Sequence, residues 1–162
     1  MAVAFTAILM IMVYNFYNAT RAVYATGVAG QVLQDGVNTA LSQMIQGKTE
    51  PTGVYRLSEA VSYTITSLSE MHFVGTDGIE RWYKLNAGAT QLIYHHPTTN
   101  GTVDEVIYQA PATAIMTLRF SIPTVANYSA AVVGIDLSIA QTVSGRAVSG
   151  AASTIVQLRN HP

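Results

Sequence analysis

The sequence predicts an α+β protein in which one long N-terminal α-helix, apolar in its first half, packs through its second half on an antiparallel β-sheet. Two observations predict this class: the chain begins with an uncharged apolar run, and from Gly53 onward it changes to short alternating segments separated by turn residues. With 162 residues, of which 49% are hydrophobic and 10% charged, the chain can build one compact domain and one extended arm.

The apolar run at residues 1–13 reads MAVAFTAILMIMV and carries no charged side chain. Such a run has to be buried in a membrane, in an assembly or in the core of a soluble domain. Residues 1–20 have about the length of ~20 residues that a helix needs to cross a bilayer. No basic residue precedes Arg21, and a signal peptide needs one. We therefore interpret the chain as a form already trimmed by a processing peptidase.

A single helix is expected from Met1 to about Gln46, because no proline interrupts this part of the chain. Its first half, residues 1–25, should protrude, and residues 26–162 should form the globular domain. In the second half, residues 26–46, apolar side chains recur at helical spacing and predict the face that packs on the sheet: Leu33, Val37, Leu41 and Met44. Gly47 is a typical helix end. At about 1.5 Å per residue the helix would be roughly 69 Å long.

The sheet is expected within residues 53–162. Alternating patterns predict strands near 61–66, 71–74, 79–85, 91–95, 105–108, 114–122, 131–140 and 154–158. The segment Gly75-Thr76-Asp77-Gly78 predicts a tight hairpin, because Asp-Gly readily adopts positive φ angles. A second hairpin is expected through Asn86-Ala87-Gly88.

Composition excludes several functions. The net charge is −1 and no basic cluster is present, so the sequence shows no surface for a nucleic-acid backbone. Without cysteines there are no disulfides, thiolate metal sites or cysteine nucleophiles. No nucleophile elbow, phosphate-binding loop or metal-ligand spacing is found. We therefore expect no enzyme, no cofactor and no metal. The adjacent His95 and His96 should point to opposite faces of a strand and are interpreted as surface residues.

Two residue groups allow a functional and a structural interpretation. Asp77 could form a catalytic carboxylate pair with Glu80 or Asp104, but its place before a glycine favours a role in the turn. The aromatic residues Trp82, Tyr83 and Tyr94 could form a sugar-binding platform, but aromatic residues on adjacent strands more often pack across strands.

Three stretches are similar to proteins of the type IV pilin and type II secretion pseudopilin superfamily. They are the apolar helix with its amphipathic continuation, the meander from Gly53 through FVGTDGIERWYKL to QLIYHH, and the closing segment that ends in Leu-Arg-Asn160. Members of this superfamily usually carry glutamate at the fifth residue of the mature chain, where this sequence has Phe5. The family lacks that glutamate mainly in some tip-located minor pseudopilins and in many archaeal-type pilins.

The resemblance implies a structural subunit of an extracellular type IV pilus-like filament, which assembles with copies of itself through its apolar helix. It also implies a single-pass precursor in the inner membrane and contact with the assembly machinery. Self-assembly is then expected to use the apolar side chains of the arm: Met1, Val3, Phe5, Ile8, Leu9, Ile11, Met12, Val13 and Phe16. The alternatives are a membrane-anchored binding domain at the cell surface and a tip-located minor pseudopilin.

Overall fold

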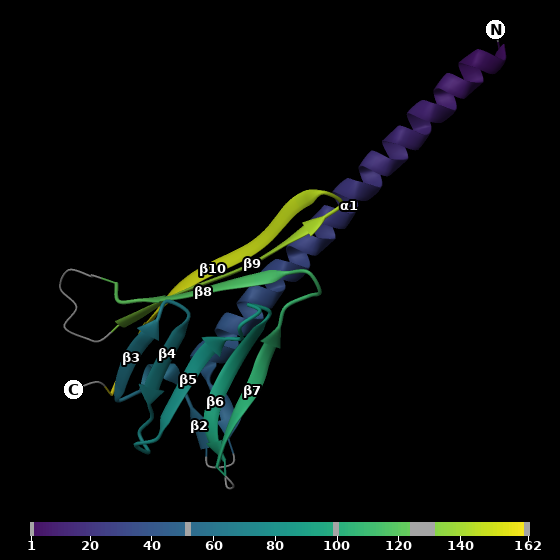
Figure 1. The fold of residues 1–162 in the computed structure, drawn as a ribbon. Coiled ribbons are helices and arrows are strands. Elements are labelled where there is room, and N and C mark those ends of the chain that lie inside the picture. The colour runs from purple at the N-terminus through teal and green to yellow at the C-terminus, as the bar shows by residue number, and fades with distance from the viewer. Residues whose placement is uncertain (1, 51–52, 99–100, 124–131, 161–162) are drawn as a thin grey trace.

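The fold is seen in a computed structural model that describes residues 2–50, 53–98, 101–123 and 132–160. It consists of one N-terminal helix and antiparallel strands, and the helix leaves the domain as a straight arm (Figure 1). The predicted α+β class, with one N-terminal helix packed on antiparallel strands, is confirmed.

Helix α1 spans Ala2–Gln46 and ends where the sequence predicts. Gly47 has φ 75° and donates its N–H to the carbonyl oxygen of Gln43 at 3.1 Å. This left-handed residue ends the helix, and glycine adopts the conformation without the steric cost of a Cβ atom.

The strands form two main sheets and a short ladder instead of the single sheet that was expected. The ladder pairs β1 (Lys48–Glu50) with β2 (Gly53–Tyr55), neither of which was predicted, and the 3-10 helix η1 (Leu57–Glu59) follows it. The five-stranded sheet has the order β3-β4-β5-β6-β7, in which each strand pairs with its neighbours in sequence. Its strands are β3 (Ser62–Ser67), β4 (Glu70–Val74), β5 (Glu80–Leu85), β6 (Gln91–Thr98) and β7 (Gly101–Gln109).

The three-stranded sheet has the order β10-β9-β8. Its strands are β8 (Ile115–Ser121), β9 (Val132–Val143) and β10 (Arg146–Gln157). The last strand was expected at residues 154–158 but begins at Arg146, because Ser144 (φ 51°) and Gly145 (φ 76°) form a two-residue turn that continues the β9 pairing.

Two sheets form because the outer edge of β8 meets hairpin turns of the five-stranded sheet, not another strand. Met116 donates its N–H to the carbonyl oxygen of Ala89 at 2.7 Å, and Phe120 donates to that of Leu68 at 2.8 Å. These bonds satisfy backbone donors on an otherwise open strand edge.

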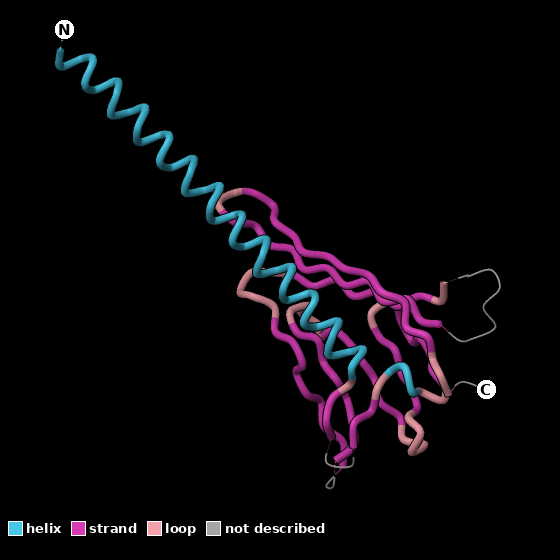
Figure 2. The backbone as a smooth tube through the Cα atoms, turned by 180° about the vertical axis from the view of Figure 1, so that it is seen from behind, coloured by secondary structure: helices cyan, strands magenta, loops and turns pink. Residues whose placement is uncertain are grey.

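The second half of α1 lies across both sheets (Figure 2) and shares one core with them. Its residues Leu33, Val37 and Met44 are fully buried, together with inward-facing residues of each sheet. Alternate burial along the strands, for example buried Met116, Leu118 and Phe120 on β8, places one face of each sheet in this core.

Two glycines set how closely the helix approaches the strands. A Cβ atom on Gly150 of β10 would lie 2.6 Å from the backbone nitrogen of Gln34, and one on Gly36 of α1 would lie 2.0 Å from the phenol oxygen of Tyr108. Next to Gly150, the side-chain amide of Gln34 donates to the carbonyl of Ala151 and accepts from its N–H, both at 3.2 Å. The helix therefore covers part of the free edge of β10.

Candidate functional site

The first candidate site is the exposed apolar segment of α1 between Phe5 and Tyr17. Every large hydrophobic side chain in this segment is exposed, from 47% for Leu9 to 75% for Phe16. Residues 8–13 are apolar without a break and successive residues of a helix are about 100° apart, so apolar side chains point to all sides. This segment, which we call the apolar arm, has no cover from the domain.

The residues that sequence reasoning assigned to self-assembly lie on this arm. The exposed members are Phe5, Ile8, Leu9, Ile11, Met12, Val13 and Phe16. Met1 and the side chain of Val3 lie outside the part of the chain that the structure describes. On one side of the arm a shallow, almost wholly apolar groove of about 480 Å³ is lined by Thr6, Leu9, Met10, Val13, Tyr14 and Tyr17.

Within the described residues, no helix has both the length and the apolar character needed to cross a membrane.

The residues assigned to helix–sheet packing lie in the core. Leu33, Val37 and Met44 have no exposed surface, and Leu41 is 6% exposed. The two parts of α1 therefore differ in exposure: the domain buries one face of the C-terminal half, whereas the apolar arm is exposed.

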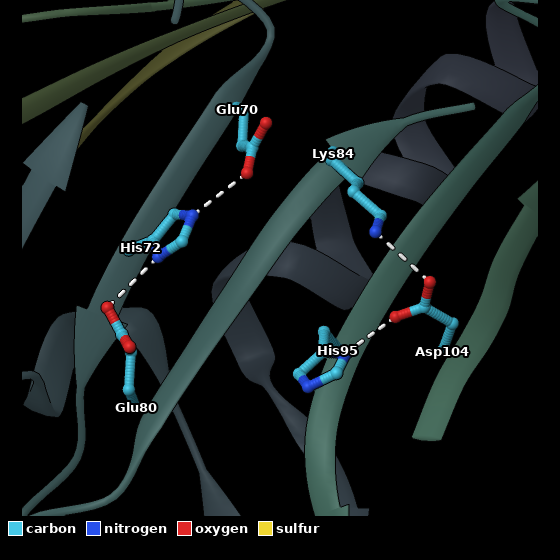
Figure 3. Close-up of polar contacts among 6 residues, drawn as sticks. All are labelled: Glu70, His72, Glu80, Lys84, His95 and Asp104. Carbon is cyan, nitrogen blue, oxygen red and sulfur yellow. Dashed lines mark hydrogen bonds and ion pairs between the residues drawn. The ribbon is translucent and has the colours of Figure 1, made fainter. Parts of the chain in front are cut away.

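The second candidate site is a polar row on the outer face of the five-stranded sheet, which sequence reasoning did not assign (Figure 3). Cross-strand pairing aligns His72 of β4 with Trp82 of β5, Trp82 with His95 of β6, and His95 with Asp104 of β7. The Trp82 ring is stacked on that of His95 (centroids 3.4 Å apart, 7°) and on that of His72 (4.8 Å, 12°).

Carboxylates contact the histidines at both ends of this row. His72 Nδ1 lies 2.9 Å from Glu80 Oε1, and His72 Nε2 lies 2.9 Å from Glu70 Oε1. At the other end, His95 Nδ1 and Lys84 Nζ lie 2.5 Å and 3.0 Å from the two oxygens of Asp104. The signal that could have found the row is the spacing Glu70-x-His72 and Glu80-x-Trp82-x-Lys84, which places charged and aromatic residues on one face of two paired strands.

These contacts shift two pKa values. Burial by itself lowers the pKa of His72, but the hydrogen bonds that its ring donates to Glu70 and Glu80, together with their negative charges, outweigh it, so the pKa lies above its ordinary value of 6.5. The hydrogen bond from His95 holds the pKa of Asp104 below its ordinary value of 3.8, against the effect of burial and with help from Lys84.

The structure decides between the two interpretations of the aromatic residues. Tyr83 and Tyr94 are 1% and 0% exposed and stack on each other in the core, whereas Trp82 lies on the opposite face with histidine rings on both its sides. These residues therefore pack across strands, and a shared sugar-binding platform is excluded. His95 and His96 point to opposite faces as predicted, but His96 is a buried residue, 7% exposed, and not a surface residue.

Asp77 has the structural role that its turn position predicts. It accepts hydrogen bonds from the N–H of Ile79 at 3.1 Å and from Arg81 Nη1 and Nη2 at 3.0 Å and 2.8 Å. Arg81 is fully buried, so the bidentate pair fastens the β4–β5 hairpin to the core. Glu80 and Asp104 instead contact histidines of the polar row.

Among the described residues, no group of three or more histidine, aspartate or glutamate side chains could hold a metal ion. No protein-family model matches the chain, no curated protein matches its sequence, and no solved structure matches its fold. The two sites are therefore interpreted from their own chemistry: one is an exposed apolar segment of α1, and the other is a protonatable polar row.

Proposed function

We propose that this chain is a structural subunit, a pilin or pseudopilin, of a type IV pilus-like extracellular filament, and that the apolar arm is its assembly element. The observation that carries the proposal is the exposure of large apolar side chains on every side of the arm. Soluble monomers rarely expose contiguous apolar patches larger than a few hundred Å².

The amount of exposed surface favours an assembly with several neighbours. Burying a large apolar side chain contributes roughly 1.5–3 kcal/mol, so about ten half-exposed ones contribute on the order of 10 kcal/mol. Association costs an estimated 4–15 kcal/mol. One partner helix covers only one side of the arm and leaves little net gain. Several copies packed around each other cover all sides, as in the core of a helical filament.

The architecture agrees with this role. A helix that projects from an α+β domain, with its C-terminal half packed on antiparallel strands, resembles the pilin fold. The subunit would be held in the inner membrane as a single-pass precursor until the assembly machinery transfers it to the growing filament. Phe5 stands where most family members have glutamate, so subunits would be aligned by apolar packing and register alone.

Substitution of Leu9 tests the proposal. A charge buried among apolar helices is costly, so Leu9→Lys should abolish filaments seen by electron microscopy, while circular dichroism of the domain stays unchanged. The matched control is Ile155→Lys, which introduces the same charge at a residue of β10 that is 61% exposed and should leave filaments intact. Normal filaments from Leu9→Lys would contradict the proposal.

Cross-linking separates a filament from a membrane anchor. The chain contains no cysteine, so a single Leu9→Cys residue reports on its neighbours without background. If the arm lies in a filament core, material sheared from the cell surface should contain disulfide-linked dimers of the Leu9→Cys chain. If the arm is an anchor surrounded by lipid, the chain should remain monomeric and stay in the membrane fraction.

A further inference from the structure

The outer face of the five-stranded sheet contains a histidine whose two ring nitrogens both contact carboxylate oxygens. His72 lies between Glu70 of its own strand and Glu80 of β5, at 2.9 Å from each. A neutral imidazole has one N–H donor and one lone pair, whereas an imidazolium has two donors. When both carboxylates are ionised, only the protonated ring can donate to both of them, so this geometry favours the imidazolium form.

The residues that face His72 come from β3, β4 and β5. Glu70 is on β4 and Glu80 on β5, and the residue that faces His72 from β3 is Thr64, which carries no charge. Trp82 stacks on the ring, and Lys84 lies 5.9 Å from the Trp82 ring centre. Lys84 pairs opposite Glu70 and contacts Asp104 at 3.0 Å, whereas both carboxylates contact the His72 ring directly. A cation stacked on an indole gains a further attraction.

We propose that Glu70, His72 and Glu80 form a proton-dependent staple on this face: the doubly protonated ring of His72 ties β4 to β5, and loss of one ring proton to solvent releases one of the two carboxylates. The change exposes one additional unpaired negative charge on the sheet. It does not depend on whether the chain assembles into a filament.

The direction of the pH effect follows from the contacts. Because the pKa of His72 is raised above 6.5 in the folded chain, the staple stabilises the fold fully below about pH 6.5, and this contribution is lost as the pH rises through the folded value. The charge of this surface should therefore change at a pH above 6.5, the ordinary pKa of histidine.

Trp82 is the only tryptophan of the chain and reports on both stacked histidines. An imidazolium in contact with an excited indole quenches its fluorescence more strongly than the neutral ring does. We would titrate Trp82 fluorescence of the full chain in detergent micelles from about pH 5 to pH 9 and record the thermal midpoint at each pH. His95→Gln removes the second histidine, so its remaining transition belongs to His72.

In the His95→Gln background, the fluorescence transition of Trp82 should shift to lower pH when Glu70→Gln or Glu80→Gln is added. The same transition should disappear when His72→Gln is added. The staple also predicts that the thermal midpoint of the wild type falls through the same transition and that this fall is absent in His72→Gln. Glu59→Gln on helix η1, where the carboxylate pairs with Arg56 and not with a histidine, is the control for loss of one carboxylate and should shift nothing. If neither glutamine variant moves the transition, or if His72→Gln keeps the fall in thermal midpoint, the staple does not exist.

Discussion

The contact between α1 and β10 leads to a prediction about one backbone position, Gly150. A Cβ atom placed there would lie 2.6 Å from Gln34 N, 2.6 Å from Leu33 C and 2.8 Å from Gln34 Cα. All three are backbone atoms, so no rotamer change can relieve the overlap. Gly150→Ala must therefore push the helix away from the strand.

The cost can be worked out from two terms. Overpacking of a core typically costs about 1–3 kcal/mol. A displaced helix also weakens the two hydrogen bonds between the Gln34 amide and Ala151, each of which contributes roughly 0.5–1.5 kcal/mol at most. We expect Gly150→Ala to lower the free energy of unfolding by about 2–4 kcal/mol, which corresponds to roughly 5–15 °C in the thermal midpoint for a chain of this size.

The assay is thermal unfolding of the full chain in detergent, followed by circular dichroism. Gly27→Ala is the matched control, because a Cβ atom there meets nothing within 4 Å and alanine is favoured over glycine inside a helix by up to about 1 kcal/mol. The same chemical change should therefore destabilise at position 150 and stabilise at position 27. If Gly150→Ala unfolds at the wild-type midpoint, the close approach of helix and strand is refuted.

Two further predictions concern single contacts of the domain. Gly36→Ala should lower the free energy of unfolding by about 1–3 kcal/mol, because its Cβ would lie 2.0 Å from the Tyr108 phenol oxygen. Adding Tyr108→Leu should restore part of this loss, measured by chemical unfolding. If the effects of the two substitutions are strictly additive, the two residues do not touch. Asp77→Ala should lower the free energy of unfolding by about 2–4 kcal/mol, because fully buried Arg81 loses a bidentate partner. Asp77→Asn keeps the acceptor for the Ile79 N–H and should cost less. Equal losses from the two variants would contradict this prediction.

Helix α1 and the β4–β5 hairpin could be predicted from the sequence because each depends on local signals. An unbroken helical stretch, a glycine after Gln46 and the Asp-Gly turn before Ile79 specify helix α1 and the β4–β5 hairpin by residue chemistry alone. The division into two sheets could not be predicted, because it depends on which groups accept hydrogen bonds from the outer edge of β8. These acceptors are the backbone carbonyls of Ala89 and Leu68, and a backbone carbonyl leaves no signal in the sequence.

The missed strand at Arg146 and the missed polar row have different causes. Ser144-Gly145 is a two-residue turn of the type that joins paired strands, so the start of β10 could have been found from turn chemistry. The row from His72 to Asp104 combines residues from four strands, and its existence depends on the register of each pair. A shift of one residue in any pair would place its side chains on opposite faces.

The two halves of α1 differ in what can stabilise them, and this difference connects the fold to the proposed function. Isolated helices are marginal in water, and most helical stability in proteins comes from tertiary packing. The C-terminal half receives that packing from both sheets through Leu33, Val37 and Met44. The segment from Phe5 to Tyr17 receives none from the domain, and exposed apolar side chains continue at Val23 and Tyr24, after the first charge at Arg21. If the arm is buried among copies of itself, the neighbours supply the packing that the domain does not, and Arg21 marks the first position where burial becomes costly.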